Sequence, residues 1–384
     1  MKRYEAERQF EALVERFVSQ AVYCREPGEE SPYFPAQVHI EPTNSCNLRC
    51  THCHHYRDEH GRNKYTRKLG LMDVDLFRKI LDEIGPLGCS VTLNVQGEPL
   101  LHPRIVEMVR IAKGHGIYLS LLTNATRLTR ELTTRFLDAG LDRMVFSFDA
   151  CTKDVYESVR INSKFEPTIA NILDFLNENE LRGHPTHVCV SGVQQSRTMP
   201  HTEEYRTYFG KLPVDKIFLN PMLNLCGVSG TADEIDMARY MDIAPQDRPV
   251  CRISWENLVV NWDGLVSPCP VDVNVLAPVG DANTERLQDI WNGERMREFR
   301  RAHLTRDYSA IEKNGPVCSA CNCLFDEEYD LFKFQGYAVK AIARAAIHHA
   351  HHLAQGAAEA GADDEARAAF LRSEREKYPR EDPA

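Results

Sequence analysis

Three cysteines, Cys46, Cys50 and Cys53, follow a predicted strand in the run Glu41-Pro-Thr-Asn-Ser-Cys-Asn-Leu-Arg-Cys-Thr-His-Cys53. Three thiolates at this spacing can hold three irons of a four-iron cluster and leave the fourth iron open to an outside molecule. Zinc is the alternative occupant, with a fourth ligand from His52, His54 or His55, because zinc usually takes four protein ligands. An open iron would make this loop a reactive centre.

A second set of cysteines lies near the end of the chain. Cys251 and Cys269 flank a predicted hairpin whose turn reads Asn261-Trp-Asp-Gly264, and Cys318 and Cys321 share a short segment. Four thiolates gathered from a hairpin and a tight turn suit either a fully ligated cluster or a structural zinc ion. The spacing alone does not separate these two occupants.

Between residues 37 and 222, short β-like runs alternate with amphipathic helical runs. The predicted strands are 38–43, 91–96, 117–123, 143–148, 187–193 and 216–221, and the predicted helices are 73–84, 104–113, 130–139, 167–177 and 202–212. Six such repeats predict an α/β fold with a parallel sheet, curled as a partial (β/α)6 TIM-like barrel. Active residues of such folds lie at the carboxyl ends of the strands, where the first cysteine loop begins.

The rest of the chain divides around this barrel. Residues 1–36 are expected to form an amphipathic docking helix and a lead-in, and residues 223–250 a linker. A small cysteine-rich domain is expected over 251–330, with a predicted helix near 287–300. Residues 331–384 read as a helical tail whose last part forms a surface helix or a frayed end.

Composition bounds the function. The 384 residues are 43% hydrophobic and 27% charged, with a formal net charge of −10, which argues against a nucleic-acid partner and is compatible with a cationic substrate. No apolar run is long enough to span a membrane, and residues 1–20 lack the apolar core of a signal peptide. We therefore expect a cytoplasmic protein whose thirteen cysteines serve as metal ligands before disulfides.

Motifs at successive strand ends resemble those of the radical S-adenosylmethionine (SAM) superfamily over about 38–222. The second strand is followed by Gln96-Gly-Glu98, similar to the family's Gly-Gly-Glu with Gln96 replacing the first glycine. The other matching segments are Thr123-Asn-Ala125, Ser147-Phe-Asp-Ala150, 156–160 and strand 188–193. Read without the family, Glu98 is a helix-end charge, Ser147 and Asp149 a capping pair, and Arg160 a surface ion pair.

The resemblance implies cofactors and ligands. A [4Fe-4S] cluster would be held by Cys46, Cys50 and Cys53. SAM would be held by Gly97, Glu98, Asn124, Ser147, Asp149 and Arg160, with Glu98 near its amino group and Arg160 near its carboxylate. One electron, from a donor such as flavodoxin or ferredoxin, would split SAM into a 5′-deoxyadenosyl radical that removes hydrogen from substrate.

The second cysteine set resembles a twitch domain, which is a shortened SPASM domain. The resemblance implies one auxiliary cluster held by Cys251, Cys269, Cys318 and Cys321, and two [4Fe-4S] clusters in total. Position 327 is Glu, where a full SPASM pattern needs another cysteine. Cys323 is an extra thiol that competes with Cys321.

The cysteine spacing most resembles radical dehydrogenases of aminocyclitol and aminoglycoside antibiotic biosynthesis. This implies oxidation of a secondary alcohol of a small sugar-like substrate to a ketone, with the auxiliary cluster as electron acceptor. One alternative is an epimerase with Cys189, Cys226 or Cys323 as hydrogen donor. Others are a peptide-modifying enzyme, disfavoured by the 36 residues before the first strand, and an electron carrier. The sequence does not identify the base that accepts the hydroxyl proton, although Arg252 is one candidate.

Overall fold

The computed structural model describes residues 27–56, 60, 64–226, 228, 247, 250–321 and 362–380. The predicted N-terminal helix, most of the linker 223–250 and Cys323 lie outside the described residues. None of the described helices is both long and apolar enough to cross a membrane.

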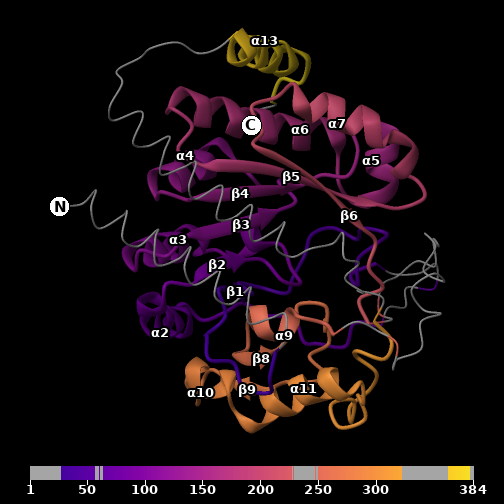
Figure 1. Ribbon diagram of the computed structural model, residues 1–384. Helices are drawn as coiled ribbons and strands as arrows, with labels where there is room; N and C mark the ends of the chain where they lie inside the picture. Colours follow the sequence, from indigo (N-terminus) through magenta and orange to yellow (C-terminus); the bar gives the residue numbers. More distant parts are fainter. Residues whose placement is uncertain are drawn as a thin grey trace.

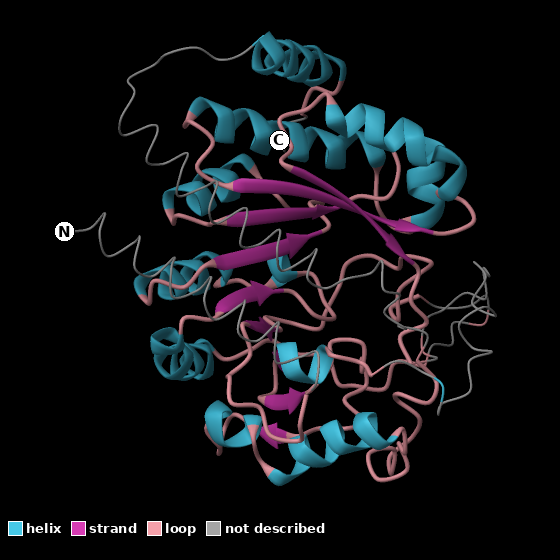
Figure 2. Ribbon diagram, in the orientation of Figure 1, coloured by secondary structure: helices cyan, strands magenta, loops and turns pink. Residues whose placement is uncertain are grey.

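The six predicted strands form a parallel sheet in chain order, which confirms the α/β prediction. They are β1 (Gln37–Ile40), β2 (Ser90–Leu93), β3 (Leu119–Thr123), β4 (Arg143–Ser147), β5 (His187–Gln194) and β6 (Lys216–Pro221). Figure 2 shows their arrowheads directed to one edge of the sheet. Loops that carry chemistry therefore meet at that edge.

Helices cover one face of this sheet (Figure 1). The five predicted ones are α2 (Val74–Ile84), α3 (Ile105–Gly114), α4 (Arg130–Asp138), α6 (Phe165–Leu181) and α7 (Thr202–Gly210), and three 3-10 turns lie at Gly85–Leu87, Pro99–Leu101 and Met199–His201. Local capping begins two of the helices. The Asp73 side chain accepts from two backbone N–H groups of α2, and Thr129 accepts from Leu132 N in α4.

The core lies between these helices and alternate residues of each strand. Val38 and Ile40 of β1 pack with Phe77 of α2, and Phe146 of β4 packs edge-on against Phe175 of α6. Period-2 alternation sends the intervening residues to the other face of the sheet. That face carries polar side chains, among them His39, which lies between Asn94 and Asn257.

Three predictions differ from the structure. β1 ends at Ile40 and β2 at Leu93, short of the predicted ends at 43 and 96, because the chain turns away from the sheet before Pro42, which has no N–H to donate. A seven-residue helix, α5 (Lys153–Val159), was not predicted, since it is too short to show periodicity. The predicted helix 287–300 is two helices, α10 (Leu287–Trp291) and α11 (Glu294–Thr305), separated at Asn292 and Gly293.

The cysteine-rich region continues the barrel sheet. β7 (Asn257–Val260) pairs in parallel with β1, and β8 (Leu265–Ser267) and β9 (Gly280–Asp281) follow antiparallel, giving the order β6-β5-β4-β3-β2-β1-β7-β8-β9. The short helix α9 (Ile253–Glu256) leads into β7. The hairpin prediction is confirmed, and Gly264 takes the positive φ of 89° that its turn requires. Backbone hydrogen bonds thus join the two cysteine regions.

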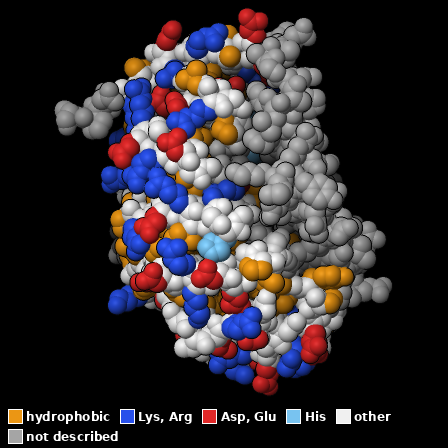
Figure 3. Space-filling view, turned by 90° about the vertical axis from the view of Figure 1, so that its left-hand side faces the viewer, with side chains coloured by type: hydrophobic (Ala, Val, Ile, Leu, Met, Phe, Trp, Pro, Cys, Tyr) orange, Lys and Arg blue, Asp and Glu red, His pale blue; other side chains and the backbone are white. Residues whose placement is uncertain are grey.

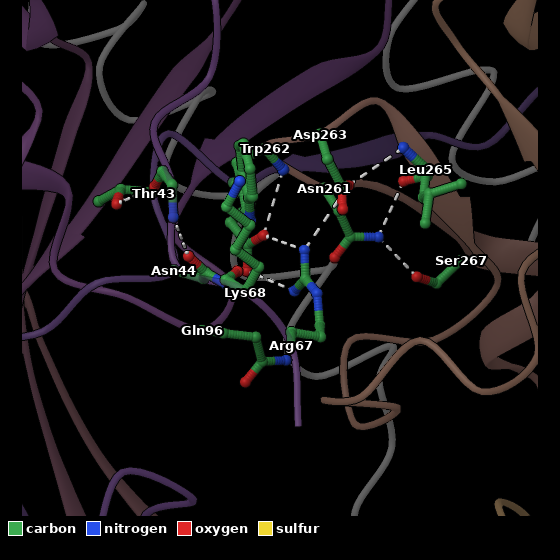
Figure 4. A network of polar contacts seen from close by, with 12 residues as sticks. Thr43, Asn44, Arg67, Lys68, Gln96, Asn261, Trp262, Asp263, Leu265 and Ser267 are labelled. Carbon is green, nitrogen blue, oxygen red and sulfur yellow. Dashed lines mark hydrogen bonds and ion pairs between the residues drawn. The ribbon is translucent and has the colours of Figure 1, made fainter. Parts of the chain in front are cut away.

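A buried ion pair reinforces this junction (Figure 4). Arg67 donates two hydrogen bonds to the Glu41 carboxylate, at 3.1 and 2.8 Å, and Trp262 N donates a third at 3.1 Å. The Glu41 side chain is fully buried. Gly70 completes the junction, because a Cβ there would lie 2.3 Å from the Trp262 ring.

The described part of the tail is helix α13 (Ala362–Lys377), which packs against α6. Leu371 is 3% exposed, and Tyr208 donates to Glu374 at 2.8 Å. Arg375 forms an ion pair with Asp174. The surface-helix reading of the tail is confirmed for these residues.

The face shown in Figure 3 carries basic and acidic side chains that are interspersed, with hydrophobic side chains scattered among them. No single sign of charge dominates that face.

Leu371→Ala should lower the free energy of unfolding by about 2 kcal/mol, because it removes a buried side chain that joins α13 to the core. Leu181→Ala is the matched control, since Leu181 is 75% exposed, and should change it by less than about 0.5 kcal/mol. Urea unfolding measures both. Equal values for the two variants would show that α13 adds nothing to stability.

Candidate active site

The first cysteine loop is held by backbone hydrogen bonds to the segment after α5. Arg49 N donates to Ile161 O at 3.0 Å, and Thr51 N donates to Val159 O at 2.9 Å. Within the loop, Cys53 N donates to Cys50 O at 3.0 Å. These bonds place the loop beside Arg160, which lies between the two accepting residues.

The three thiols of the loop are neighbours in a desolvated setting. Burial raises the pKa of all three, that of Cys46 to about 12, and the negative charges of the other thiolates act in the same direction on Cys53. Leu48 N lies 3.5 Å from Cys46 Sγ, a contact that stabilises a thiolate. Iron would have to displace these protons on binding.

The donor set suits a cluster with one open iron. Within the described ranges, no three His, Cys, Asp or Glu side chains close around a point where one ion would sit. His52 Nδ1 is engaged by Gln195 at 3.2 Å, and His55 Nε2 by Gln96 O at 2.9 Å. His54 Nδ1 lies 3.6 Å from Cys53 Sγ, so His54 stays beside the three thiols as the loop's one remaining candidate for a fourth ligand.

Glu98 lies at the carboxyl end of β2 with its carboxylate buried and oriented. Thr123 Oγ1 donates to Oε1 at 2.7 Å, and Asn124 N donates to Oε2 at 2.7 Å. Leu100 N also donates to Oε1, so Glu98 caps the 3-10 turn that follows it. Burial raises the pKa of Glu98, and its charge acts on Cys46. The carboxylate is thus both a helix-end charge and a neighbour of the thiols.

Gly97 lets the Glu98 segment approach the cysteine loop. A Cβ on Gly97 would lie 2.2 Å from Thr43 O and 2.6 Å from Ser45 O. Glu98 N donates to Ser45 O at 2.8 Å across the same contact. A glycine is therefore required by backbone proximity.

Asn124 connects the end of β3 to the cysteine loop. Its Nδ2 donates to Asn47 Oδ1 at 3.1 Å and lies 3.9 Å from Cys46 Sγ. Its Oδ1 accepts from Thr126. The side chain is thus oriented by protein contacts on both sides.

Asp149 and Arg160 form a buried ion pair. Arg160 Nε donates to Asp149 Oδ2 at 2.6 Å, and Val193 N donates to Oδ1 at 2.8 Å. Arg160 is 6% exposed, so the reading as a surface ion pair is wrong. The Arg160 charge acts on Cys46, Cys50 and Cys53 and offsets the accumulation of thiolates.

Ser147 ends β4 on the sheet face opposite the helices. It is paired with Ser191 of β5, whose hydroxyl accepts from Asn220 Nδ2 of β6 at 2.8 Å. These three residues form a polar row at the carboxyl ends of three adjacent strands. Such a row can bind hydroxyl or amino groups of a ligand.

The structure brings the four auxiliary cysteines together. Cys251 precedes α9, Cys269 follows β8, and Cys318 and Cys321 lie in a turn closed by Cys321 N donating to Cys318 O at 3.2 Å. Each of the four thiols acts electrostatically on the others. Val271 N lies 3.4 Å from Cys269 Sγ. The set offers four thiolates without the open position of the first loop.

Among the candidate catalytic residues that the structure describes, Cys189 lies apart from the other two. Cys189 pairs with Lys216, the first residue of β6, so it lies at the amino-terminal half of the sheet with His187 at 3.4 Å. Cys226 lies among the auxiliary thiols. Arg252 directly follows Cys251, before α9. The structure therefore does not bring Cys189 to the edge where the first cysteine loop lies.

Two residues that position the site went unassigned in the sequence. Gln96 donates from Nε2 to Pro270 O at 2.7 Å, while its carbonyl contacts His55, so one residue touches both cysteine regions. Its departure from the family glycine was the available signal. His303 Nε2 lies 3.4 Å from Cys318 Sγ, and no sequence signal marked this helical histidine.

Gly97→Ala should displace the cysteine loop, because the added methyl group overlaps two carbonyl oxygens. We expect less iron per chain after anaerobic reconstitution and a loss of about 1–3 kcal/mol in the free energy of unfolding. Gly114→Ala is the matched control, since nothing lies within 4 Å of its Cβ. Full iron content and unchanged unfolding in Gly97→Ala would contradict the close approach.

Two curated relatives match parts of the chain. A tungsten-containing aldehyde ferredoxin oxidoreductase cofactor-modifying protein of Pyrococcus furiosus is 27% identical over 331 residues, covering 74% of this chain and 86% of that one. An AdoMet-dependent heme synthase of Methanosarcina barkeri is 30% identical over 36% of this chain and 38% of its own. The second match is thus confined to part of each protein.

Two solved structures share the fold. BtrN in complex with AdoMet and 2-DOIA has a TM-score of 0.50 and 15% identity, covering 77% of this chain and 96% of that one. Streptococcus suis SuiB bound to precursor peptide SuiA has a TM-score of 0.55 and 14% identity, covering 71% and 68%. At these identities the likeness concerns the fold alone.

Family models match the chain in two places. The radical SAM superfamily model matches residues 40–190, and the SPASM iron-sulfur cluster-binding domain model matches residues 251–322. The first implies a [4Fe-4S] cluster and SAM, and the second implies additional iron–sulfur clusters. The chain therefore belongs to the radical SAM superfamily and carries a SPASM domain after its partial barrel.

Proposed function

We propose that this enzyme is a radical SAM dehydrogenase that oxidises a secondary alcohol of a small aminocyclitol- or sugar-like substrate to a ketone. The observation that carries the proposal is the complete four-thiol set held in the same sheet as the three-thiol loop. A site without an open position suits electron transfer, which a dehydrogenase needs and an epimerase does not.

The residues at the strand ends fit the proposed cofactors. Cys46, Cys50 and Cys53 would hold the first cluster. Glu98 presents an oriented, buried carboxylate suited to an ammonium group, and Arg160 a buried guanidinium suited to a carboxylate. SAM bound there supplies a 5′-deoxyadenosyl radical that takes one hydrogen atom from a carbon of the substrate.

Substrate hydroxyl groups would find hydrogen-bonding partners on the sheet face opposite the helices. Ser147, Ser191 and Asn220 form the polar row described above, and they lie at the same edge as Asp149 and Arg160. The acidic balance of the chain suits a substrate that carries amino groups. These features support a small polar substrate.

The proposed oxidation balances in three transfers. The carbinol carbon would lose a hydrogen atom to the adenosyl radical, the hydroxyl group would lose a proton to a base, and the auxiliary cluster, held by Cys251, Cys269, Cys318 and Cys321, would accept the remaining electron. The carbon–oxygen bond becomes a carbonyl. His52 is not the base, because its Nδ1 already accepts from the Gln195 amide and its Nε2–H faces Asp149, 3.9 Å away.

The proposal is tested with anaerobically reconstituted full-length protein, dithionite, SAM and a panel of aminocyclitols. Cys50→Ala should reduce 5′-deoxyadenosine formation to background, because it removes a ligand of the first cluster. Cys269→Ala should retain 5′-deoxyadenosine formation but lose the ketone, because only the electron acceptor is removed. Mass spectrometry of both products separates the two effects.

Cys89→Ala serves as the control, since Cys89 is a buried thiol that donates to Ile84 O within the barrel core. It should leave both products unchanged. Solvent deuterium at the substrate carbon, without a ketone, would replace the proposal with epimerisation. Cleavage of SAM with no change in any aminocyclitol would overturn the substrate class.

A further inference from the structure

A fifth thiol lies beside the auxiliary set. Cys226 follows β6, the last strand of the barrel, and is 8% exposed. It packs in a small core together with Cys269, Cys318 and Cys321. The segment that follows the barrel thus contributes a cysteine to the auxiliary site.

Cys226 lies at an edge of the four-thiol set. Its thiol is within hydrogen-bonding reach of Cys321, and Cys321 and Cys269 both act on it electrostatically. The four other thiols act on one another in every pairing. The four cysteines that the sequence resemblance implies as ligands complete one set, and Cys226 is a fifth thiol packed beside Cys321.

The backbone around Cys226 is specifically arranged to bring it there. Leu225 and Cys226 both have left-handed conformations, with φ of 48° and 57°, which residues other than glycine seldom adopt. Asn224 Nδ2 donates to Ala320 O at 2.7 Å, next to Cys321. Strained residues persist only where surrounding contacts hold them, and they gather at functional sites.

We propose that Cys226 is a positioning residue that does not ligate iron and donates an S–H hydrogen bond to the Cys321 thiolate of the auxiliary cluster. Its Sγ lies 3.5 Å from Val271 O, which marks it as a donor. A thiolate that ligates iron is a stronger acceptor than this neutral carbonyl, because the hydrogen bond is then charge-assisted. The S–H group would turn from Val271 to Cys321 when the cluster is present.

This hydrogen bond makes the auxiliary cluster easier to reduce. Hydrogen bonds to ligand sulfurs help to set the reduction potential of iron–sulfur clusters, and a donor favours the more negative, reduced state. The use of that effect rests on the proposed function, in which the cluster accepts the substrate electron. The effect itself is independent of any substrate.

The test is a redox titration of the auxiliary cluster in full-length protein reconstituted without substrate. Electron paramagnetic resonance monitors the reduction of the cluster. Cys46, Cys50 and Cys53 are replaced by alanine so that only the auxiliary cluster contributes a signal. In this background, Cys226→Ala should shift the midpoint potential to a more negative value with unchanged iron per chain. Cys226→Ser keeps a hydrogen-bond donor, so its midpoint potential should stay close to that of the protein that retains Cys226.

Cys89→Ala is the matched control and should leave the potential unchanged, because Cys89 donates to a backbone carbonyl far from the auxiliary thiols. Loss of iron in Cys226→Ala equal to that in Cys321→Ala would overturn the proposal and make Cys226 a ligand. An unchanged potential would also overturn it. A shifted potential in this background, together with no ketone from the protein that keeps Cys46, Cys50 and Cys53, would uphold it while refuting the dehydrogenase.

Discussion

The pairing of β1 with both β2 and β7 is the constraint on which the rest of the molecule depends. β1 precedes the three-cysteine loop, and β7 leads into the hairpin that ends at Cys269. Two parallel ladders therefore hold both groups of thiols to one rigid sheet. The Glu41–Arg67 pair and Trp262 N lie where β1 and β7 end. There the Glu41 carboxylate accepts hydrogen bonds from Arg67 and Trp262 N, beyond the last hydrogen bonds of the ladder. Breaking one partner of such a buried pair leaves an uncompensated charge, which costs about 3–5 kcal/mol.

Electrostatics at the strand ends follow from burial. Desolvation raises the pKa of the thiols and of Glu98, which opposes the accumulation of negative charge in the first site. Arg160 is the buried cation that offsets it, and Asp149 keeps the guanidinium in place. The same residues thus stabilise the loop and, in the proposed function, would present groups of opposite charge to SAM.

The auxiliary site shows how two regions of a chain can share one centre. Gln96, from the end of β2, reaches the carbonyl next to Cys269, and Cys226, from the end of β6, reaches Cys321. Gln96 belongs to the barrel and Cys226 to the segment that follows it, and both contact the neighbouring domain. The linker boundaries expected from the sequence therefore understate how closely the two units are built together.

The sequence by itself determined the elements and indicated the candidate ligands. Alternating apolar residues and capping signals gave the six parallel strands and the five long helices, because these patterns act within a few residues. Cysteine spacing and short motifs indicated both thiol sites for the same reason. Tertiary structure alone decided the parallel pairing of β7 with β1, the Arg67–Glu41 contact, the reach of Gln96 and the place of Cys226. These join residues that are far apart in the chain, and no local period or propensity records which distant partners meet.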